Sequence, residues 1–133
     1  MLFCLDEKEA DLINHSHTNP SYLKDCHLPD LVTATTDMKQ ALTSADTVVI
    51  AVPSPAFVEV LAQLQPYFHH HLIIATKGLF AAPDFLFSSQ VEKILQADFY
   101  AFLSGPSHAE DVIQRMPTWV TFSSPNLSHA QEL

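Results

Sequence analysis

A lysine followed by a glycine stands directly after an apolar run in the middle of the chain. Lys77 follows residues 72–75, which have the composition of a buried strand, and precedes Gly78. An ammonium group at the end of a buried strand can hold an anionic oxygen or polarise a carbonyl group. Most lysines in loops are only solvated charges. The residue type alone therefore leaves a binding lysine and a loop lysine both open.

A second polar cluster, residues 104–107 (Ser-Gly-Pro-Ser), follows the apolar stretch 99–103. Ser107 is predicted to cap a helix that runs to residue 114, and the free backbone N–H groups of such a helix form an anion site. The spacing of Ser107 and Glu110 is equally that of an ordinary capping box. The chain has only two glycines, Gly78 and Gly105. Each marks either a position that cannot carry a Cβ or an ordinary turn.

Counting residues excludes several kinds of site. A GxGxxG dinucleotide motif needs more glycines than the two present, and a GxxxxGK phosphate loop needs two glycines before its lysine. The consecutive histidines 69–71 cannot all face one ion from an extended backbone, so we expect no metal site. Cys4 and Cys26 lack CxxC spacing, which favours free thiols in a reducing cytoplasm.

The composition of the 133 residues is that of one folded domain with an acidic surface. The formal net charge is −9, and hydrophobic residues make up 47% of the chain. This charge argues against nucleic acid and anionic membranes as general partners. No apolar run approaches the ~20 residues of a membrane span, so we expect a cytoplasmic protein without membrane insertion. A phosphate-bearing ligand would need a local positive site drawn from six basic residues.

The hydrophobic pattern predicts alternating strands and helices. Strands are expected at residues 1–5, 31–36, 47–52, 72–75, 99–103 and 118–122, with 47–52 buried on both faces. Helices are expected at 7–15, 37–44, 56–64, 83–96, 107–114 and 126–133, with a loop at 18–29. This alternation predicts an α/β fold: a doubly wound, mainly parallel sheet with helices on both faces. Such sheets bind ligands at the carboxyl ends of their strands, where the polar clusters of this sequence lie.

Taken in order, these clusters resemble the amino-terminal domain of NAD(P)-dependent glycerol-3-phosphate dehydrogenase of the bacterial type. The matching pieces are Asn-Pro at 19–20, Thr-Thr-Asp at 35–37, Val-Pro-Ser at 52–54, Ala-Thr-Lys-Gly-Leu at 75–79, Ser-Gly-Pro-Ser at 104–107 and Pro-Thr at 117–118. The resemblance covers nearly the whole chain and implies a Rossmann-like fold.

By that resemblance, Lys77 is a catalytic lysine that contacts both the substrate and the nicotinamide end of the cofactor. Gly105 and Ser107 would line a phosphorylated small-molecule substrate, and Pro53 and Ala109 would bind NAD or NADP. The implied reaction interconverts dihydroxyacetone phosphate and sn-glycerol 3-phosphate in glycerophospholipid biosynthesis.

Asp6 would also bind the cofactor. At the end of the opening strand the family usually has an aromatic, a small and then a basic residue, and here these are Phe3, Cys4 and Leu5, followed by Asp6. A carboxylate there suits a ribose 2′-hydroxyl rather than a 2′-phosphate. This departure favours NAD over NADP.

The resemblance further implies that residues 1–133 form a partial nucleotide-binding domain. The first βα unit with its glycine-rich loop, and the helical substrate domain with a second lysine, would be absent. We therefore expect a chain that is marginally stable and inactive alone.

Two alternatives stay open. A non-catalytic Rossmann-like module would bind a nucleotide or a partner and cover its open sheet edge, for example as a homodimer. A neighbouring dehydrogenase class would act on another small acid, which Lys77 beside residues 104–107 disfavours.

Overall fold

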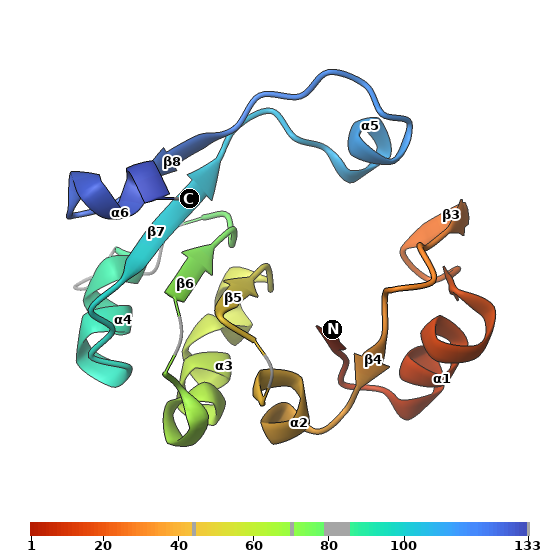
Figure 1. Cartoon of the computed structure of the whole chain (residues 1–133), viewed down its shortest axis with the longest axis horizontal. Coiled ribbons are helices and arrows are strands. Elements are labelled where there is room, and N and C mark those ends of the chain that lie inside the picture. Colours follow the sequence, from red (N-terminus) through yellow and green to blue (C-terminus); the bar gives the residue numbers. More distant parts are fainter. Residues whose placement is uncertain (44, 70, 79–85, 133) are drawn as a thin grey trace. The chain divides into compact units, whose positions relative to one another are not determined.

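The computed structural model describes residues 1–43, 45–69, 71–78 and 86–132. The chain divides into two compact units. The first contains Met1–Ser44 and His108–Pro117, and the second contains Ala45–Ser107 and Thr118–Leu133. Figure 1 shows the strands and helices of both. No helix in the described part of the chain combines the length and apolar character needed to cross a membrane.

The first unit is built on the helix α1 (Glu7–Ser16), as the sequence predicts. The Asp6 carboxylate accepts a hydrogen bond from the Lys8 backbone N–H at 2.8 Å and caps the helix. Ala10 and Ile13 point inward and pack with Cys4 and Ala34 in a small core. The strand β1 (Leu2–Phe3) pairs in parallel with β4 (Ala34–Thr35) beside this core.

Asp37 caps the helix α2 (Met38–Leu42), also as predicted. Its carboxylate accepts hydrogen bonds from the backbone N–H groups of Lys39 and Gln40. The expected end of this helix at residue 44 lies outside the described residues.

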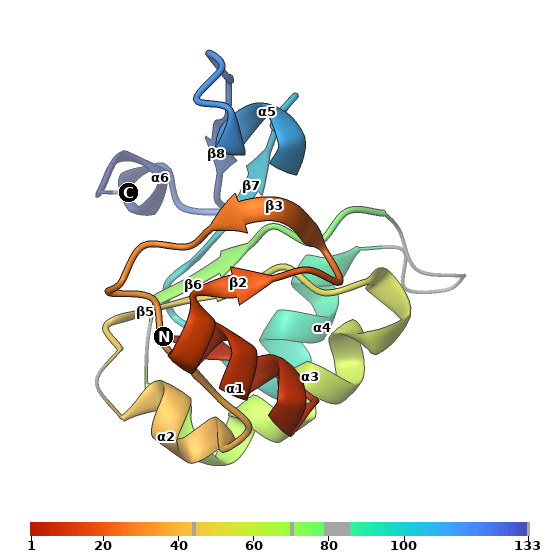
Figure 2. The same ribbon diagram turned by 90° about the vertical axis from the view of Figure 1, so that its right-hand side faces the viewer.

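The prediction of a loop at residues 18–29 is wrong. The strands β2 (Thr18–Asn19) and β3 (Leu23–His27) form an antiparallel hairpin, and β2 lies against α1 (Figure 2). The turn is closed by a bond from the Tyr22 N–H to the Asn19 carbonyl at 3.2 Å. The sequence Leu-Lys-Asp-Cys-His lacks the β-branched residues and alternation typical of strands. These residues form a strand because they pair with β2 across the turn, and not because their own composition favours one.

Two further strands are shorter and more exposed than predicted. The stretch 1–5 is extended only at Leu2–Phe3, and the side chains of Met1, Leu2 and Leu5 are exposed. In the stretch 31–36 only Ala34–Thr35 are paired, and Leu31 is 94% exposed. Each strand has only one hydrogen-bonded neighbour in the described structure, so little of its apolar surface is covered.

The second unit contains a sheet of four strands in the order β5-β6-β7-β8. The strands β5 (Thr47–Ile50), β6 (His71–Ile74) and β7 (Tyr100–Ser104) are parallel, and β8 (Thr121–Ser123) runs antiparallel to β7. The strands expected at 47–52, 72–75 and 99–103 are thereby confirmed. Burial of the first on both faces is wrong: Ile50 is buried, but Val49 is 57% exposed, because β5 is an edge strand.

Helices cover both faces of this sheet. After the short 3-10 turn η1 (Ser54–Ala56), the helix α3 (Phe57–Leu64) buries Phe57, Leu61 and Leu64, the predicted stripe. A second 3-10 turn, η2 (Gln65–Tyr67), follows it. The helix α4 (Phe87–Ile94) packs on α3 through Phe87, whose ring centroid lies 4.6 Å from that of Phe57. Residues 79–85, including the predicted start of this helix, lie outside the described residues.

The opposite face is covered by the helix α6 (Leu127–Glu132), which contacts β7 and β8. The His129 ring on α6 stacks on Phe99, at a centroid distance of 4.3 Å. Phe99 and Tyr100 are successive residues, so their side chains point to opposite faces. Tyr100 bonds to Glu92 of α4, which places α4 and α6 on different sides of the sheet.

The Tyr100 hydroxyl connects β7 to α4 by a hydrogen bond, which makes the stability of the fold depend on pH under alkaline conditions. It donates a hydrogen bond to the Glu92 carboxylate at 2.6 Å. Burial, and then this bond, raise the pKa of Tyr100 to about 12. Between pH 10 and 12 only the unfolded chain ionises this tyrosine, so the free energy of unfolding should fall by about 2–3 kcal/mol. Below pH 10 this group gives no pH dependence.

Urea titrations at pH 9, 10, 11 and 12 measure this loss, with Tyr100→Phe as the reference chain that cannot ionise there. Between pH 10 and 12, the free energy of unfolding should fall less in the Phe variant than in the wild type, and the difference between the two falls should equal the contribution of Tyr100. Equal losses in the two chains would show that Tyr100 is not the group responsible.

Candidate anion-binding site

The second sheet places three predicted site residues at its carboxyl edge. The pairing of β5 with β6 ends at Ile50 and Ile74, and the pairing of β6 with β7 ends at Ile74 and Phe102. Pro53, Lys77 and Gly105 each follow the last of these paired residues by three positions, so all three lie in the turns after the strands. The carboxyl edge of this parallel sheet thus gathers residues that lie far apart in sequence.

Gly78 brings the turn after β6 against the turn after β5. Its φ angle of +117° is a conformation that residues with a side chain rarely adopt. A Cβ built on Gly78 would lie 3.4 Å from the Ser54 Oγ, so the Ser54 hydroxyl faces the turn that carries Lys77. At the base of the turn, the buried Thr76 donates to the Ile50 carbonyl at 3.4 Å. These contacts fix the backbone on which Lys77 stands.

Gly105 is required by a close approach of backbone rather than by an ordinary turn. Its φ angle is +139°, and a Cβ would collide with the Trp119 carbonyl oxygen and come within 3.0 Å of the Val120 Cα. Both atoms belong to the segment that leads into β8, which runs antiparallel beside β7. This contact accounts for the glycine.

The prediction that Ser107 caps a helix is wrong. The helix α5 (Ala109–Ile113) starts two residues later, and the His108 carbonyl accepts its first bonds, from Asp111 and Val112. The Ser107 N–H donates to the Gly105 carbonyl at 3.0 Å, which closes a three-residue turn. That N–H is therefore occupied within the turn. The Ser107 side chain is half-buried.

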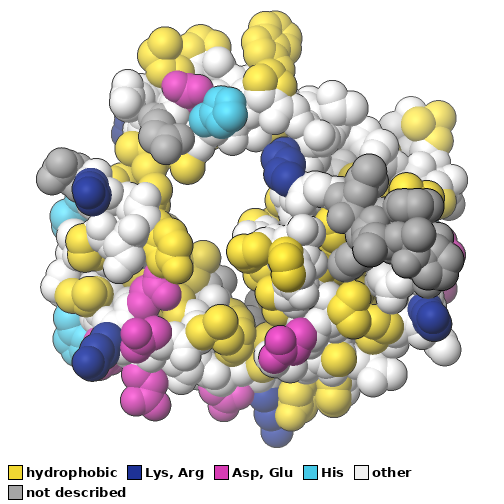
Figure 3. Space-filling model, turned by 180° about the vertical axis from the view of Figure 1, so that it is seen from behind, with side chains coloured by type: hydrophobic (Ala, Val, Ile, Leu, Met, Phe, Trp, Pro, Cys, Tyr) yellow, Lys and Arg dark blue, Asp and Glu magenta, His cyan; other side chains and the backbone are white. Residues whose placement is uncertain are grey.

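The positive charge at this edge comes from Lys77, whose side chain is exposed. In the part of the chain that the structure describes, the Lys77 ammonium has no carboxylate partner, and the Ser54 and Ser107 hydroxyls have no hydrogen-bond partner. On the face shown in Figure 3, Lys and Arg side chains stand singly and form no broad positive patch. One cation with two free hydroxyls can hold a small anionic group such as a phosphate or a developing alkoxide.

The remaining predicted cofactor residues, Asp6 and Ala109, lie in the first unit. Asp6 stands at the carboxyl end of β1, where one carboxylate oxygen caps α1. Ala109 is the first residue of α5 and is exposed.

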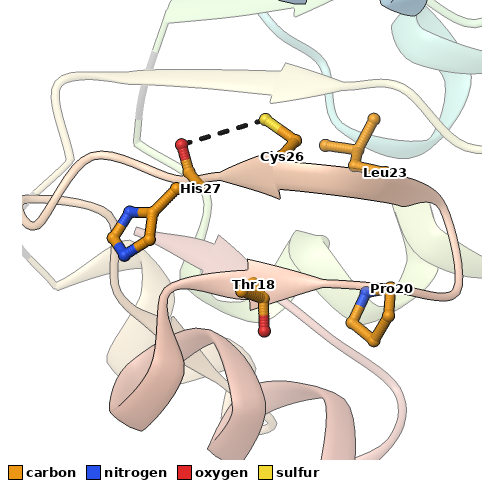
Figure 4. A pocket seen from close by; sticks show the side chains of 5 residues that line it. All are labelled: Thr18, Pro20, Leu23, Cys26 and His27. Carbon is orange, nitrogen blue, oxygen red and sulfur yellow. Dashed lines mark hydrogen bonds between the residues drawn. The ribbon is translucent and has the colours of Figure 1, made fainter.

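A pocket in the first unit is less suited to an anion. It has a volume of about 380 Å³ and lies on the β2–β3 hairpin (Figure 4), lined by Thr18, Pro20, Leu23, Cys26 and His27. None of these side chains is a lysine or an arginine. Among the described residues, no group of three or more His, Cys, Asp or Glu side chains could hold a metal ion.

The thiols of Cys4 and Cys26 are both free. Burial, and then the nearby Glu9 carboxylate, raise the pKa of the Cys4 thiol.

The sequence places Ser54 in the Val-Pro-Ser cluster at a strand end but assigns it no role. Sequence reasoning missed the role of the Trp119 carbonyl. The contact between Gly105 and Trp119 has no local signal, because it depends on the antiparallel return of β8.

The fold is that of a Rossmann-type α/β domain, a class whose ligands bind at the carboxyl ends of the parallel strands. A solved glycerol-3-phosphate dehydrogenase from Coxiella burnetii superposes with a TM-score of 0.88 at 29% sequence identity, over 98% of this chain and 41% of that one. The family model for the NAD-dependent glycerol-3-phosphate dehydrogenase N-terminus matches residues 1–130. The chain belongs to this family.

Curated relatives agree with this membership. Glycerol-3-phosphate dehydrogenase [NAD(P)+] of Myxococcus xanthus is 40% identical, over 86% of this chain and 36% of the relative. The protein of the same name from Bacillus subtilis is 38% identical, over 98% of this chain and 40% of the relative. The chain thus spans about two fifths of the length of these relatives.

Proposed function

We propose that this chain supplies the nucleotide-binding part of an NAD(P)-dependent glycerol-3-phosphate dehydrogenase, which interconverts dihydroxyacetone phosphate and sn-glycerol 3-phosphate. The observation that carries the proposal is that Pro53, Lys77 and Gly105 all lie in the turns at the carboxyl edge of one parallel sheet. Family membership supports it, and so do the names of the relatives. Lys77 is the proposed catalytic residue, with Gly105 and Ser107 beside the substrate.

The residues at this edge fit a phosphorylated ligand and a nicotinamide cofactor. Gly78 and Gly105 let the turns that carry these residues pack against Ser54 and the Trp119 backbone. Pro53, Asp6 and Ala109 are the residues proposed to hold NAD or NADP. When bound, the cofactor supplies the hydride.

In the proposed mechanism Lys77 acts on the C2 oxygen of the substrate. During reduction of dihydroxyacetone phosphate, negative charge develops on this oxygen, and the ammonium group stabilises that charge. The Ser107 hydroxyl orients the substrate, since it is free to donate a hydrogen bond. The turn from Gly105 to Ser107 holds this hydroxyl in place through its internal hydrogen bond.

Equilibrium binding of NADH to the purified 133-residue chain tests the proposal. Fluorescence titration should show saturable binding that excess NAD competes away and excess ribose 5-phosphate does not. Binding that never saturates, or that ribose 5-phosphate displaces equally well, would refute a specific nucleotide site. A second titration, with sn-glycerol 3-phosphate, tests the alternative of a non-catalytic module, which would bind NADH but not this substrate.

Asp6 should set the preference between the two cofactors. The proposed role of its carboxylate is to accept a hydrogen bond from a ribose 2′-hydroxyl and to repel a 2′-phosphate. Asp6→Asn removes the charge but keeps a good cap for α1. We expect the wild-type chain to bind NADH more tightly than NADPH. In the variant, the ratio of the NADPH dissociation constant to the NADH dissociation constant should be about 5–10-fold smaller.

Titrations of both chains with both cofactors measure the ratio. Asp37→Asn is the matched control, because Asp37 caps α2 in the same way and should leave the ratio unchanged. Tighter NADPH binding by the wild-type chain would contradict the preference for NAD. The cytoplasmic location and the homodimer expected from the sequence stay predictions.

A further inference from the structure

Ser54 is a polar side chain that the proposed reaction leaves unused. It follows β5 and is half-buried at the same sheet edge as Lys77. A Cβ built on Gly78 would lie 3.4 Å from the Ser54 Oγ. Ser54 therefore borders the turn that carries the lysine.

The backbone around Ser54 is held in one conformation. Pro53 and Pro55 stand on either side, and each proline ring fixes its φ angle. The Ala56 N–H donates to the Pro53 carbonyl at 3.0 Å, and the Phe57 N–H donates to the Ser54 carbonyl, so the turn is closed from both ends. A hydroxyl on such a turn loses little conformational freedom when it binds a ligand.

The Ser54 hydroxyl is also free to bind. It has no hydrogen-bond partner within the described part of the chain, although its neighbour Thr76 uses its own hydroxyl to bond the Ile50 carbonyl. Packing against a glycine needs no hydroxyl, and an alanine would fill the same space. A partly buried hydroxyl without a partner is instead suited to a ligand that supplies one.

Resting on the function proposed above, we propose that Ser54 is a further substrate-binding residue. Its hydroxyl donates a hydrogen bond to an anionic oxygen of the phosphorylated substrate held by Lys77. The hydroxyl adds a directed neutral donor to the lysine charge, which by itself attracts any anion. Together the two groups favour a ligand with several oxygens, such as a phosphate ester, over a single small anion.

Isothermal titration calorimetry with sn-glycerol 3-phosphate tests this role in the 133-residue chain. Loss of one hydrogen bond to a charged oxygen should weaken binding by Ser54→Ala about 10-fold. Ser54→Thr keeps the hydroxyl and should stay within about 2-fold of the wild type. Ser54→Asp places a carboxylate beside Lys77 and should abolish binding. Ser123→Ala makes the alanine change on β8, at the other edge of the sheet, and should have no effect.

The outcomes separate this inference from the proposed function. A wild-type chain that binds no sn-glycerol 3-phosphate overturns both. A wild-type chain that binds, with an alanine variant of equal affinity, overturns only the role of Ser54. Circular dichroism checks that each variant is folded. If the alanine variant is unfolded, the threonine and aspartate variants decide, and equal affinities for these two would reject the proposal.

Discussion

Gly105→Ala should destabilise the chain more than any other single replacement at the site. The new Cβ would collide with the Trp119 carbonyl oxygen, a backbone atom that cannot rotate away as a side chain would. The φ angle of +139° adds strain for any residue with a Cβ. We expect the free energy of unfolding to fall by about 2–4 kcal/mol. That is a large share of a typical total stability of about 5–15 kcal/mol.

Gly78→Ala provides the matched control for this prediction. Gly78 has a similarly positive φ angle of +117°, but its Cβ would meet Ser54 at 3.4 Å, an ordinary contact distance. Only the backbone strain remains, so the free energy of unfolding of this variant should fall by about 1–2 kcal/mol. Urea denaturation followed by circular dichroism compares the three chains. Equal midpoints for the two variants would mean that the approach of the Trp119 backbone is not what requires Gly105.

The second large effect should be on ligand binding, through Lys77→Met. Methionine keeps an unbranched apolar stem and removes the charge. The ammonium is the proposed partner of the substrate oxygen, and charged hydrogen bonds contribute about 1.5–3 kcal/mol. Affinity for sn-glycerol 3-phosphate should therefore fall by about 10–100-fold. The free energy of unfolding should stay nearly constant, because the side chain is exposed.

Lys93→Met is the control for the loss of one positive charge from a chain with a net charge of −9. Lys93 lies in the last turn of α4, and its replacement should leave affinity unchanged. Lys77→Arg keeps the charge in a different geometry and should give an intermediate affinity. Equal weakening by the Lys77 and Lys93 replacements would point to a general electrostatic effect and not to a binding lysine.

The elements that sequence predicts well here are those specified by local pattern. The spacing of Phe57, Leu61 and Leu64 defines one face of a helix, and that face is buried. Asp6 and Asp37 precede their helices and cap them, since a short acidic side chain reaches the first free N–H groups. The apolar runs at 72–75 and 99–103 form neighbouring strands for the same local reason.

The failures concern features that depend on residues far apart in sequence. The strand at Leu23–His27 exists because it pairs with Thr18–Asn19, and its own composition gives no sign of it. Val49 is as apolar as Ile50, but its exposure depends on what covers the edge strand. Ser107 has the spacing of a helix cap, but the helix begins at Ala109, and the His108 carbonyl accepts its first hydrogen bonds.

The candidate site could be predicted in part. Its composition, a lysine and two glycines at strand ends, is visible in the sequence. That these strand ends meet at one edge follows only from the parallel pairing of three strands.

The central claim is that the turns after β6 and β7 form one anion site around Lys77. Amide chemical shifts of the ¹⁵N-labelled chain during titration with sn-glycerol 3-phosphate test it most directly. We predict that the amides of Lys77, Gly78, Gly105 and Ser107 shift together with a single dissociation constant, and that glycerol leaves them unchanged. Shifts confined to the β2–β3 hairpin, or different constants for the two turns, would contradict the claim.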